Sequence, residues 1–120
     1  MEIKLVKRQI SKQELEQSQL TTCTTGRKFD GGKLQFSLLP PKSIKETIRV
    51  LQYGAEKYEV GNWKVVPNAK QRYFDAALRH LWAYHEGEVL DPETGLSHLA
   101  HAICSIMFIE DIRQEEQSGD

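Results

Sequence analysis

Residues 91–112, DPETGLSHLAHAICSIMFIEDI, decide the fold of this chain. Asp91 is a helix-capping residue type and Pro92 suits the first helical turn, so we expect a helix from here to about Gln114. At 100° per residue, its apolar side chains fall on two opposite sides: Leu99, Ile103 and Ile106 on one, and Cys104, Phe108 and Ile112 on the other. A helix that is apolar on nearly all sides must be covered on nearly all sides. This predicts a helical bundle completed by oligomerisation.

Two further long helices are expected before this one. After Pro40-Pro41, apolar residues recur at helical intervals and predict a helix over residues 43–58: Ile44, Ile48, Leu51, Ala55 and Tyr58. Residues 69–86 contain neither proline nor glycine and stop at Gly87, a natural C-terminal cap, which predicts a second helix. The fold class expected is therefore all-α, a compact helical bundle.

The first part of the chain has a different character. Ser11 and Glu14 have the spacing of a capping box and predict a short helix over 12–19 in an N-terminal extension, residues 1–25. Residues 21–41 are rich in Thr, Gly and basic side chains, with a turn signal at Asp30-Gly31-Gly32, and are expected to form an irregular arm. The domain is expected over 26–114, with a flexible tail at 115–120.

Composition narrows the class of protein. The chain has 120 residues, a formal charge of -1 and 28% charged residues, which is typical of a globular domain without a nucleic-acid-binding surface. The apolar run 103–109 is far shorter than the roughly 18 residues that cross a bilayer, so no membrane partner is expected. The N-terminus lacks the pattern of a secretory signal. Because Cys23 and Cys104 are the only two cysteines, a reducing, cytoplasmic location is expected.

Two pairs of carboxylates have a three-residue spacing, Glu56 with Glu59 and Glu88 with Asp91. On a helix this spacing brings both members of a pair to one side, and oxygen donors of this kind suit Mg²⁺ or Mn²⁺. Such ions neutralise charge on phosphate oxygens, so the pattern is compatible with phosphoryl chemistry. The alternative is structural, because acidic residues are common at helix ends and Glu88 to Asp91 is also compatible with a capped turn.

Histidines form a second group of candidates. His98 and His101 lie three residues apart on the last helix, where they are suited to bind a metal, hold a phosphate or relay a proton; the alternative is core histidines with polar partners. In the helix over 69–86, Asp75 and Arg79 have the spacing of a surface ion pair. Arg79 or His80 turned inward would instead meet phosphate oxygens.

A nucleotide clamp is expected near the loop over residues 60–68. Lys57 suits a phosphate, Asn62 the edge of a base, and Trp63 a stacked purine. Trp63 is equally compatible with a place in the core.

Several of these segments together resemble a known family. They are, in order, Asp30-Gly31-Gly32-Lys33, Leu38-Leu39-Pro40-Pro41, Tyr53-Gly54-Ala55-Glu56-Lys57-Tyr58, Asn62-Trp63, Ala76-Ala77-Leu78-Arg79-His80, Gly87-Glu88 and the run from Asp91 to Ala102. Across about residues 26–112 the sequence resembles the phage dATP/dGTP diphosphohydrolase (MazZ-like) family. The resemblance implies a MazG-like all-α fold, assembly as dimers or tetramers, a place in the cytosol of the bacterial host, and cleavage of purine deoxynucleotides with Mg²⁺ or Mn²⁺.

The match to the MazG-like signature, Glu-Glu-x-x-Glu followed by Glu-x-x-Asp, is incomplete. Ala55 stands in place of the first glutamate, Glu59 is close to a helix end, and Glu88 to Asp91 spans a turn. His98 and His101 stand where MazG-like proteins often carry carboxylates, so the imidazoles are expected to replace oxygen ligands or to contact phosphate.

The resulting hypothesis is a purine nucleoside triphosphate pyrophosphohydrolase. Metal ligands are expected among Glu56, Asp75, Glu88 and Asp91. Catalytic groups are expected among Glu88, Asp91, His98 and His101. Substrate is expected to meet Lys33, Lys57, Asn62, Trp63, Arg79 and His80, with the arm around Lys33 closing over the site. The alternatives are a phage protein that sequesters a nucleotide immune signal without cleaving it, and a structural protein that binds no nucleotide.

Overall fold

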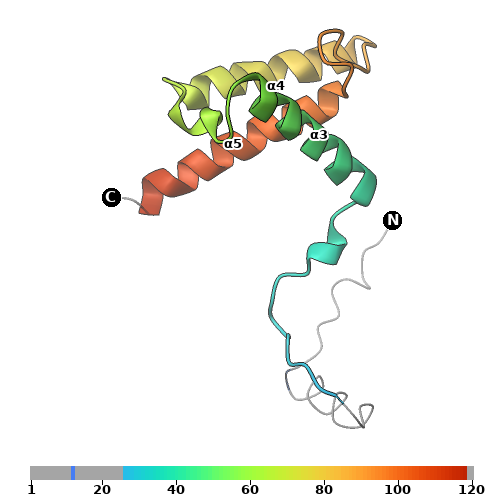
Figure 1. Ribbon diagram of the computed structural model, residues 1–120, viewed down its shortest axis with the longest axis vertical. Helices are drawn as coiled ribbons and strands as arrows, with labels where there is room; N and C mark the ends of the chain where they lie inside the picture. The colour runs from blue at the N-terminus through green and yellow to red at the C-terminus, as the bar shows by residue number, and fades with distance from the viewer. Residues whose placement is uncertain (1–11, 13–25, 119–120) are drawn as a thin grey trace. The chain divides into compact units, whose positions relative to one another are not determined.

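The computed structural model describes Lys12 and residues 26–118 (Figure 1). It contains two units, residues 1–38 and 39–120. In the first, the backbone N–H of Lys33 donates to the carbonyl of Asp30 at 3.1 Å and Gly32 has φ 84°, which confirms the turn predicted at Asp30-Gly31-Gly32. A short 3-10 helix, η1 (Phe36–Leu38), follows. Lys12 is helical, and the rest of the predicted helix 12–19 lies outside the described residues.

The second unit opens with helix α3 (Pro41–Lys57), which confirms the helix predicted over 43–58 with a start two residues earlier. Pro41 occupies the first helical position, where the missing N–H costs no hydrogen bond. Gly61 then takes the left-handed conformation, φ 79°, and leads into the 3-10 helix η2 (Asn62–Val65).

Helix α4 (Ala69–His85) confirms the second predicted helix. Gly87 has φ 106°, its N–H donates to the carbonyl of Tyr84, and the N–H of Glu88 donates to that of Ala83, each at 3.0 Å. This is a Schellman motif, so Gly87 is the cap that the sequence predicts.

Helix α5 (His98–Ser118) begins seven residues later than the predicted start at Asp91, so that part of the prediction was wrong. The Oδ1 of Asp91 accepts the N–H groups of Glu93 (2.7 Å) and Thr94 (3.3 Å), which closes a turn instead of a helical cap. Leu90 and Ser97 then pair in an antiparallel bridge. The true cap is Ser97, whose Oγ accepts the N–H groups of Leu99 and Ala100, two and three residues on.

Helix α5 runs antiparallel to α4 and also packs against α3 (Figure 1). Apart from His98 at its start, its buried residues are small, which lets the other two helices approach closely: Ala100, Ala102, Cys104 and Ser105. Val50 of α3 packs with Ala100 and Cys104 in the core, and Leu51, Leu96 and Phe108 pack around them. The described residues form helices and one isolated bridge but no strand, which confirms the all-α fold class.

Within Lys12 and residues 26–118, no helix is long and apolar enough to cross a membrane.

The Ser97 cap gives a direct test of the observed start of α5. Replacing Ser97 with alanine removes the acceptor for two backbone N–H groups, and we expect a loss of about 1 kcal/mol in the free energy of unfolding. Urea denaturation measures it, with Ser43→Ala, at an exposed position inside α3, as the control expected to stay within about 0.5 kcal/mol of wild type. Equal stability of Ser97→Ala and wild type would contradict the assignment of the cap.

Candidate functional site

A cavity of about 550 Å³ opens between the C-terminal half of α3, η2, α4, α5 and the α4–α5 loop, residues 86–97. This volume is within the usual range for small-molecule sites. Six of the residues that the sequence predicts for substrate, metal or catalysis line it: Lys57, Asn62, Trp63, His80, Asp91 and His101. The fold therefore brings predicted groups from four separate segments of the chain to one place.

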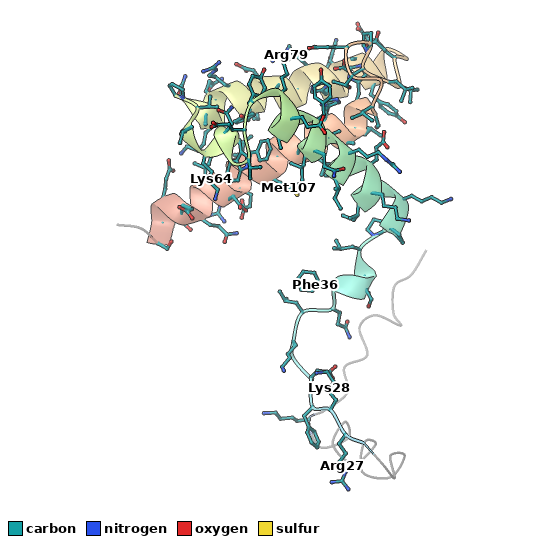
Figure 2. All side chains as sticks on the ribbon, viewed as in Figure 1. Arg27, Lys28, Phe36, Lys64, Arg79 and Met107 are labelled. Carbon is teal, nitrogen blue, oxygen red and sulfur yellow. The ribbon has the colours of Figure 1, made fainter. Side chains whose placement is uncertain are left out.

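One wall of the cavity is aromatic. The rings of Trp63 and Phe108 stack at 4.6 Å between centroids and 11° between planes, and Tyr73 meets Phe108 edge-on at 5.0 Å. The ammonium of Lys64, labelled in Figure 2, lies 5.6 Å from the centroid of the Trp63 ring. Trp63 thus packs η2 against α5 and also lines the cavity, so packing with Phe108 does not remove it from the site.

Three of the four histidines in the chain meet at the polar end of the cavity. The Nδ1 atoms of His80 and His98 are 2.8 Å apart. The rings of His80 and His101 stack at 4.5 Å and 10°. His101 Nε2 and Thr94 Oγ1 form a hydrogen bond of 2.8 Å. His80 from α4 is therefore held between two residues of α5.

The hydrogen bonds fix which nitrogen carries each proton when the rings are neutral. His98 Nε2 lies 2.8 Å from Glu88 Oε1, and because a carboxylate only accepts, this nitrogen is the donor. Nδ1 of His98 is then left with a lone pair, so it accepts from the Nδ1–H of His80. His98 is 4% exposed, whereas the side chain of Glu88 is 53% exposed. Glu88 therefore orients His98 from the solvent side.

Asp91 completes the cluster. Its Oδ2 is 3.8 Å from His80 Nδ1, and its side chain is mostly buried. Burial favours the protonated acid, but hydrogen bonds from the backbone N–H groups of Glu93 and Thr94 hold the pKa of Asp91 below its ordinary value. Within the described part of the chain, His80, Asp91 and His98 are the group whose potential metal-ligating atoms all lie within 4.8 Å of one another.

Burial, aided by the neighbouring His101 and His98, lowers the pKa of His80 from 6.5 to about 4. Burial also lowers the pKa of His101. Both rings are therefore neutral near neutral pH, the state in which an imidazole binds a metal ion or accepts a proton.

Several predicted residues lie elsewhere. Glu56 and Asp75 are exposed and do not line the cavity, and Asp75 accepts hydrogen bonds from Gln71. Arg79 lies on the outer side of α4 with Trp82 and does not line the cavity (Figure 2). Lys33 belongs to the first unit and is exposed. Of the four predicted metal carboxylates, only Asp91 belongs to the histidine cluster, and Glu88 reaches it through His98.

Lys57 is not a free cation. Its Nζ lies 3.1 Å from Glu93 Oε2, and this hydrogen-bonded partner raises the pKa of Lys57. Both side chains line the cavity and are exposed. The pair joins the end of α3 to the α4–α5 loop, and the sequence prediction had not included Glu93 or Thr94. Glu93 and Thr94 could have been found from the sequence, because both lie in the segment 91–102 that resembles the family and follow the turn-forming Asp91.

The fold and site define an all-α protein whose cavity, of a size usual for small-molecule sites, combines an aromatic wall, a lysine and a cluster of two histidines with a carboxylate. The family model described as dATP/dGTP diphosphohydrolase, N-terminal, matches residues 23–120, and the chain belongs to this family. This confirms the resemblance noted from the motifs.

A protein of Salmonella phage PMBT28 named dATP/dGTP diphosphohydrolase is 42% identical over 85 residues. The alignment covers 71% of this chain but 29% of that relative. No solved structure matches.

The buried histidines predict how the stability of the metal-free protein depends on pH. His80 has a pKa of about 4 in the folded state and 6.5 as its ordinary value, so the unfolded chain binds more protons between these pH values. The free energy of unfolding is therefore highest above about pH 6.5 and falls as the pH drops toward 4, and His101 adds to the same slope.

Urea denaturation in chelator across this range measures the slope. His80→Gln should flatten it, whereas His85→Gln, at an exposed position on the same helix, should keep the wild-type dependence. A slope that His80→Gln leaves unchanged would contradict the burial of a neutral His80.

Proposed function

We propose that this chain binds a purine nucleoside triphosphate of the dATP or dGTP type in the α3–α4–α5 cavity and hydrolyses it to monophosphate and pyrophosphate, in the cytosol of a phage-infected bacterium. The observation that carries the proposal is one cavity lined both by Lys57, His80 and Asp91 and by the aromatic rings of Trp63, Tyr73 and Phe108. Membership of the family, and the name of the phage relative, support the same chemistry.

The residues around the cavity suit the parts of such a substrate. Lys57 supplies a positive charge for phosphate oxygens once its contact with Glu93 is exchanged for the ligand. Asn62 offers an amide to the edge of a base, and Trp63 offers an aromatic surface next to the exposed, movable Lys64.

A divalent ion is the cofactor we propose. Of Mg²⁺ and Mn²⁺, the two ions that the family resemblance implies, Mn²⁺ fits the donor set better, because two of the three donors are imidazole nitrogens. Asp91 offers a carboxylate oxygen, and His80 and His98 offer nitrogens within 4.8 Å of it and of each other. A bound ion of this kind neutralises phosphate charge and lowers the pKa of a water molecule.

Among the histidines, His101 is the best placed to accept a proton from the attacking water. It lines the cavity, and its lowered pKa keeps it neutral at neutral pH. His98 is less suited, because it is buried and both of its ring nitrogens already have partners.

A second function, binding of a nucleotide without cleavage, draws support from one observation. The match covers only 29% of the relative that is named a diphosphohydrolase. The same cavity would then sequester a nucleotide signal, and the ligand would be released intact.

We also propose that a second copy of the chain covers the apolar sides of α4 and α5. On α4, Phe74, Leu78, Leu81 and Trp82 are exposed. On α5, Leu99, Ile103, Ile106 and Met107 are exposed. Helical phase puts both stripes on the side opposite the cavity-lining residues, so two copies of the pair would form a four-helix bundle. An apolar surface of this extent is typical of an interface between subunits.

The hydrolase proposal predicts the products of a simple incubation. Purified protein with purine nucleoside triphosphates and Mn²⁺ or Mg²⁺ should yield monophosphate and pyrophosphate, separated by chromatography, and chelator should stop the reaction. Intact ligand recovered from a tight complex would establish the sequestration function instead. If the protein neither cleaves nor binds any of these nucleotides, the structural role is the one that remains.

Variants test the assigned residues in the same assay. Asp91→Asn keeps the turn-closing oxygen but loses the charge, and kcat should fall about 100-fold or more. Lys57→Met should raise KM about 10-fold, as expected for loss of one charge-assisted contact. Lys45→Met, an exposed lysine of the same helix outside the cavity, is the matched control and should change neither value. Full activity of Asp91→Asn would overturn the role of the cluster.

The oligomer proposal predicts a change of mass in solution. Leu81→Glu and Ile103→Glu place a charge in each apolar stripe and should convert the assembly to monomer, as measured by light scattering during gel filtration. Val65→Glu, an exposed apolar position in η2 outside the stripes, should keep the wild-type mass. A monomeric wild type would contradict the proposal.

A further inference from the structure

We propose that His80, Asp91 and His98 form a binding site for a first-row transition-metal ion of the Mn²⁺ to Zn²⁺ series, selective against Mg²⁺, and that Glu88 orients His98 from outside it. The inference deepens the proposed function and rests on it for the reaction that the ion would serve. Binding of the ion itself requires no nucleotide.

The donor atoms argue for this class of ion. Two of the three are imidazole nitrogens and one is a carboxylate oxygen. Mg²⁺ prefers oxygen ligands and retains its waters, whereas Zn²⁺, Co²⁺ and Mn²⁺ accept imidazole. The sequence-predicted carboxylates Glu56 and Asp75 lie outside the cluster, and in the part of the chain that the structure describes no group of three carboxylates forms the all-oxygen site that Mg²⁺ favours.

The spacing of the donors fits an ion at ordinary bond lengths. Metal–nitrogen and metal–oxygen bonds of about 2.1 Å separate neighbouring ligand atoms by about 3.0–3.4 Å. Two of the three separations in the cluster bracket this range: 2.8 Å from His80 Nδ1 to His98 Nδ1, and 3.8 Å from His80 Nδ1 to Asp91 Oδ2. All three separations lie within 4.8 Å, so rotation of the side chains toward one another would bring the donors to bonding distance of one ion.

The proton arrangement already presents a lone pair. Since Nε2 of His98 donates to Glu88, Nδ1 of His98 is the lone-pair nitrogen. A metal ion would displace the hydrogen between His98 Nδ1 and His80 Nδ1, and the His80 ring would stay neutral by carrying its proton on Nε2 instead of Nδ1. A carboxylate that holds the second nitrogen of a metal-bound histidine is a recurrent arrangement, so Glu88 is a positioning residue and not a ligand.

The ligands are also held in place from behind. His101 stacks on the His80 ring at 4.5 Å, and Thr94 hydrogen-bonds His101. The Oδ1 of Asp91 is fixed by two backbone N–H groups, which leaves Oδ2 as the atom near His80. Preformed geometry of this kind lowers the cost of binding. His80 and Asp91 line the cavity, so the bound ion would be accessible to a ligand there.

The test is isothermal titration of the full chain, stripped of metal, without an affinity tag and without nucleotide. The protein carries Cys23→Ser so that this thiol cannot supply a ligand. We expect one Zn²⁺ per chain, weaker Mn²⁺, and Mg²⁺ at least about 100-fold weaker than Zn²⁺. The visible absorption of the Co²⁺-loaded protein provides a second readout of nitrogen ligation. Binding of Mg²⁺ as tight as that of Zn²⁺ would overturn the inference.

Variants assign the ligands. His80→Gln and Asp91→Asn should each lower Zn²⁺ affinity about 100-fold or more, whereas Glu88→Gln should lower it about 10-fold and keep one ion per chain. His85→Gln, one helical turn from the cluster on α4, is the matched control and should bind as wild type. Circular dichroism checks that each variant is folded, and the Co²⁺ spectrum of the wild type decides the question if one is not. Wild-type affinity in both His80→Gln and Asp91→Asn would overturn the site.

The two proposals fail in distinguishable ways. One Zn²⁺ bound through these residues without any nucleotide cleavage supports the metal site and removes the hydrolase function. Cleavage of a triphosphate by a protein that binds no transition metal in the absence of nucleotide removes the metal site and keeps the hydrolase function.

Discussion

Close approach of α5 to both of its neighbours is the constraint on which the rest of the structure depends. After His98 at its first position, the residues buried along α5 are alanine, cysteine and serine, which are small enough to let α3 and α4 pack close to it. The larger side chains Phe108 and Trp63 stack on each other and line the cavity. Val50 and Cys104 belong to the core and also line the cavity, so the cavity is built directly on the core.

The polar end of the cavity depends on how the chain enters α5. Asp91 closes a turn with one carboxylate oxygen, Ser97 caps the helix, and between them the chain reverses direction so that His98 enters at the α4 side. The second oxygen of Asp91 remains next to His80. A single aspartate therefore shapes the loop and supplies charge to the site, which explains why its pKa is held low despite burial.

The sequence predicted the three long helices, with α3 and α4 correct to within two residues at each end, because their periodicity and caps are local signals. The start of α5 was missed, since Asp91 before Pro92 is compatible with a cap and with a turn, and only contacts with Glu93 and Thr94 decide between them. The residues of the cavity were partly predicted. Spacing shows which residues share a face of a helix but not how that helix is rotated against its neighbours. The sequence therefore could not decide that His80 faces the cavity and Arg79 does not.

The ion pair of Lys57 and Glu93 has a consequence for how this cavity would sense what enters it. The pair fastens the end of α3 to the loop that carries Asp91 and Thr94. An anion that draws Lys57 to itself would leave Glu93 without its cation and remove this contact, whereas a neutral molecule of the same size would leave the contact in place. Binding of an anion would therefore separate the end of α3 from the loop, while the turn at Asp91 and the Leu90–Ser97 bridge keep the loop itself closed.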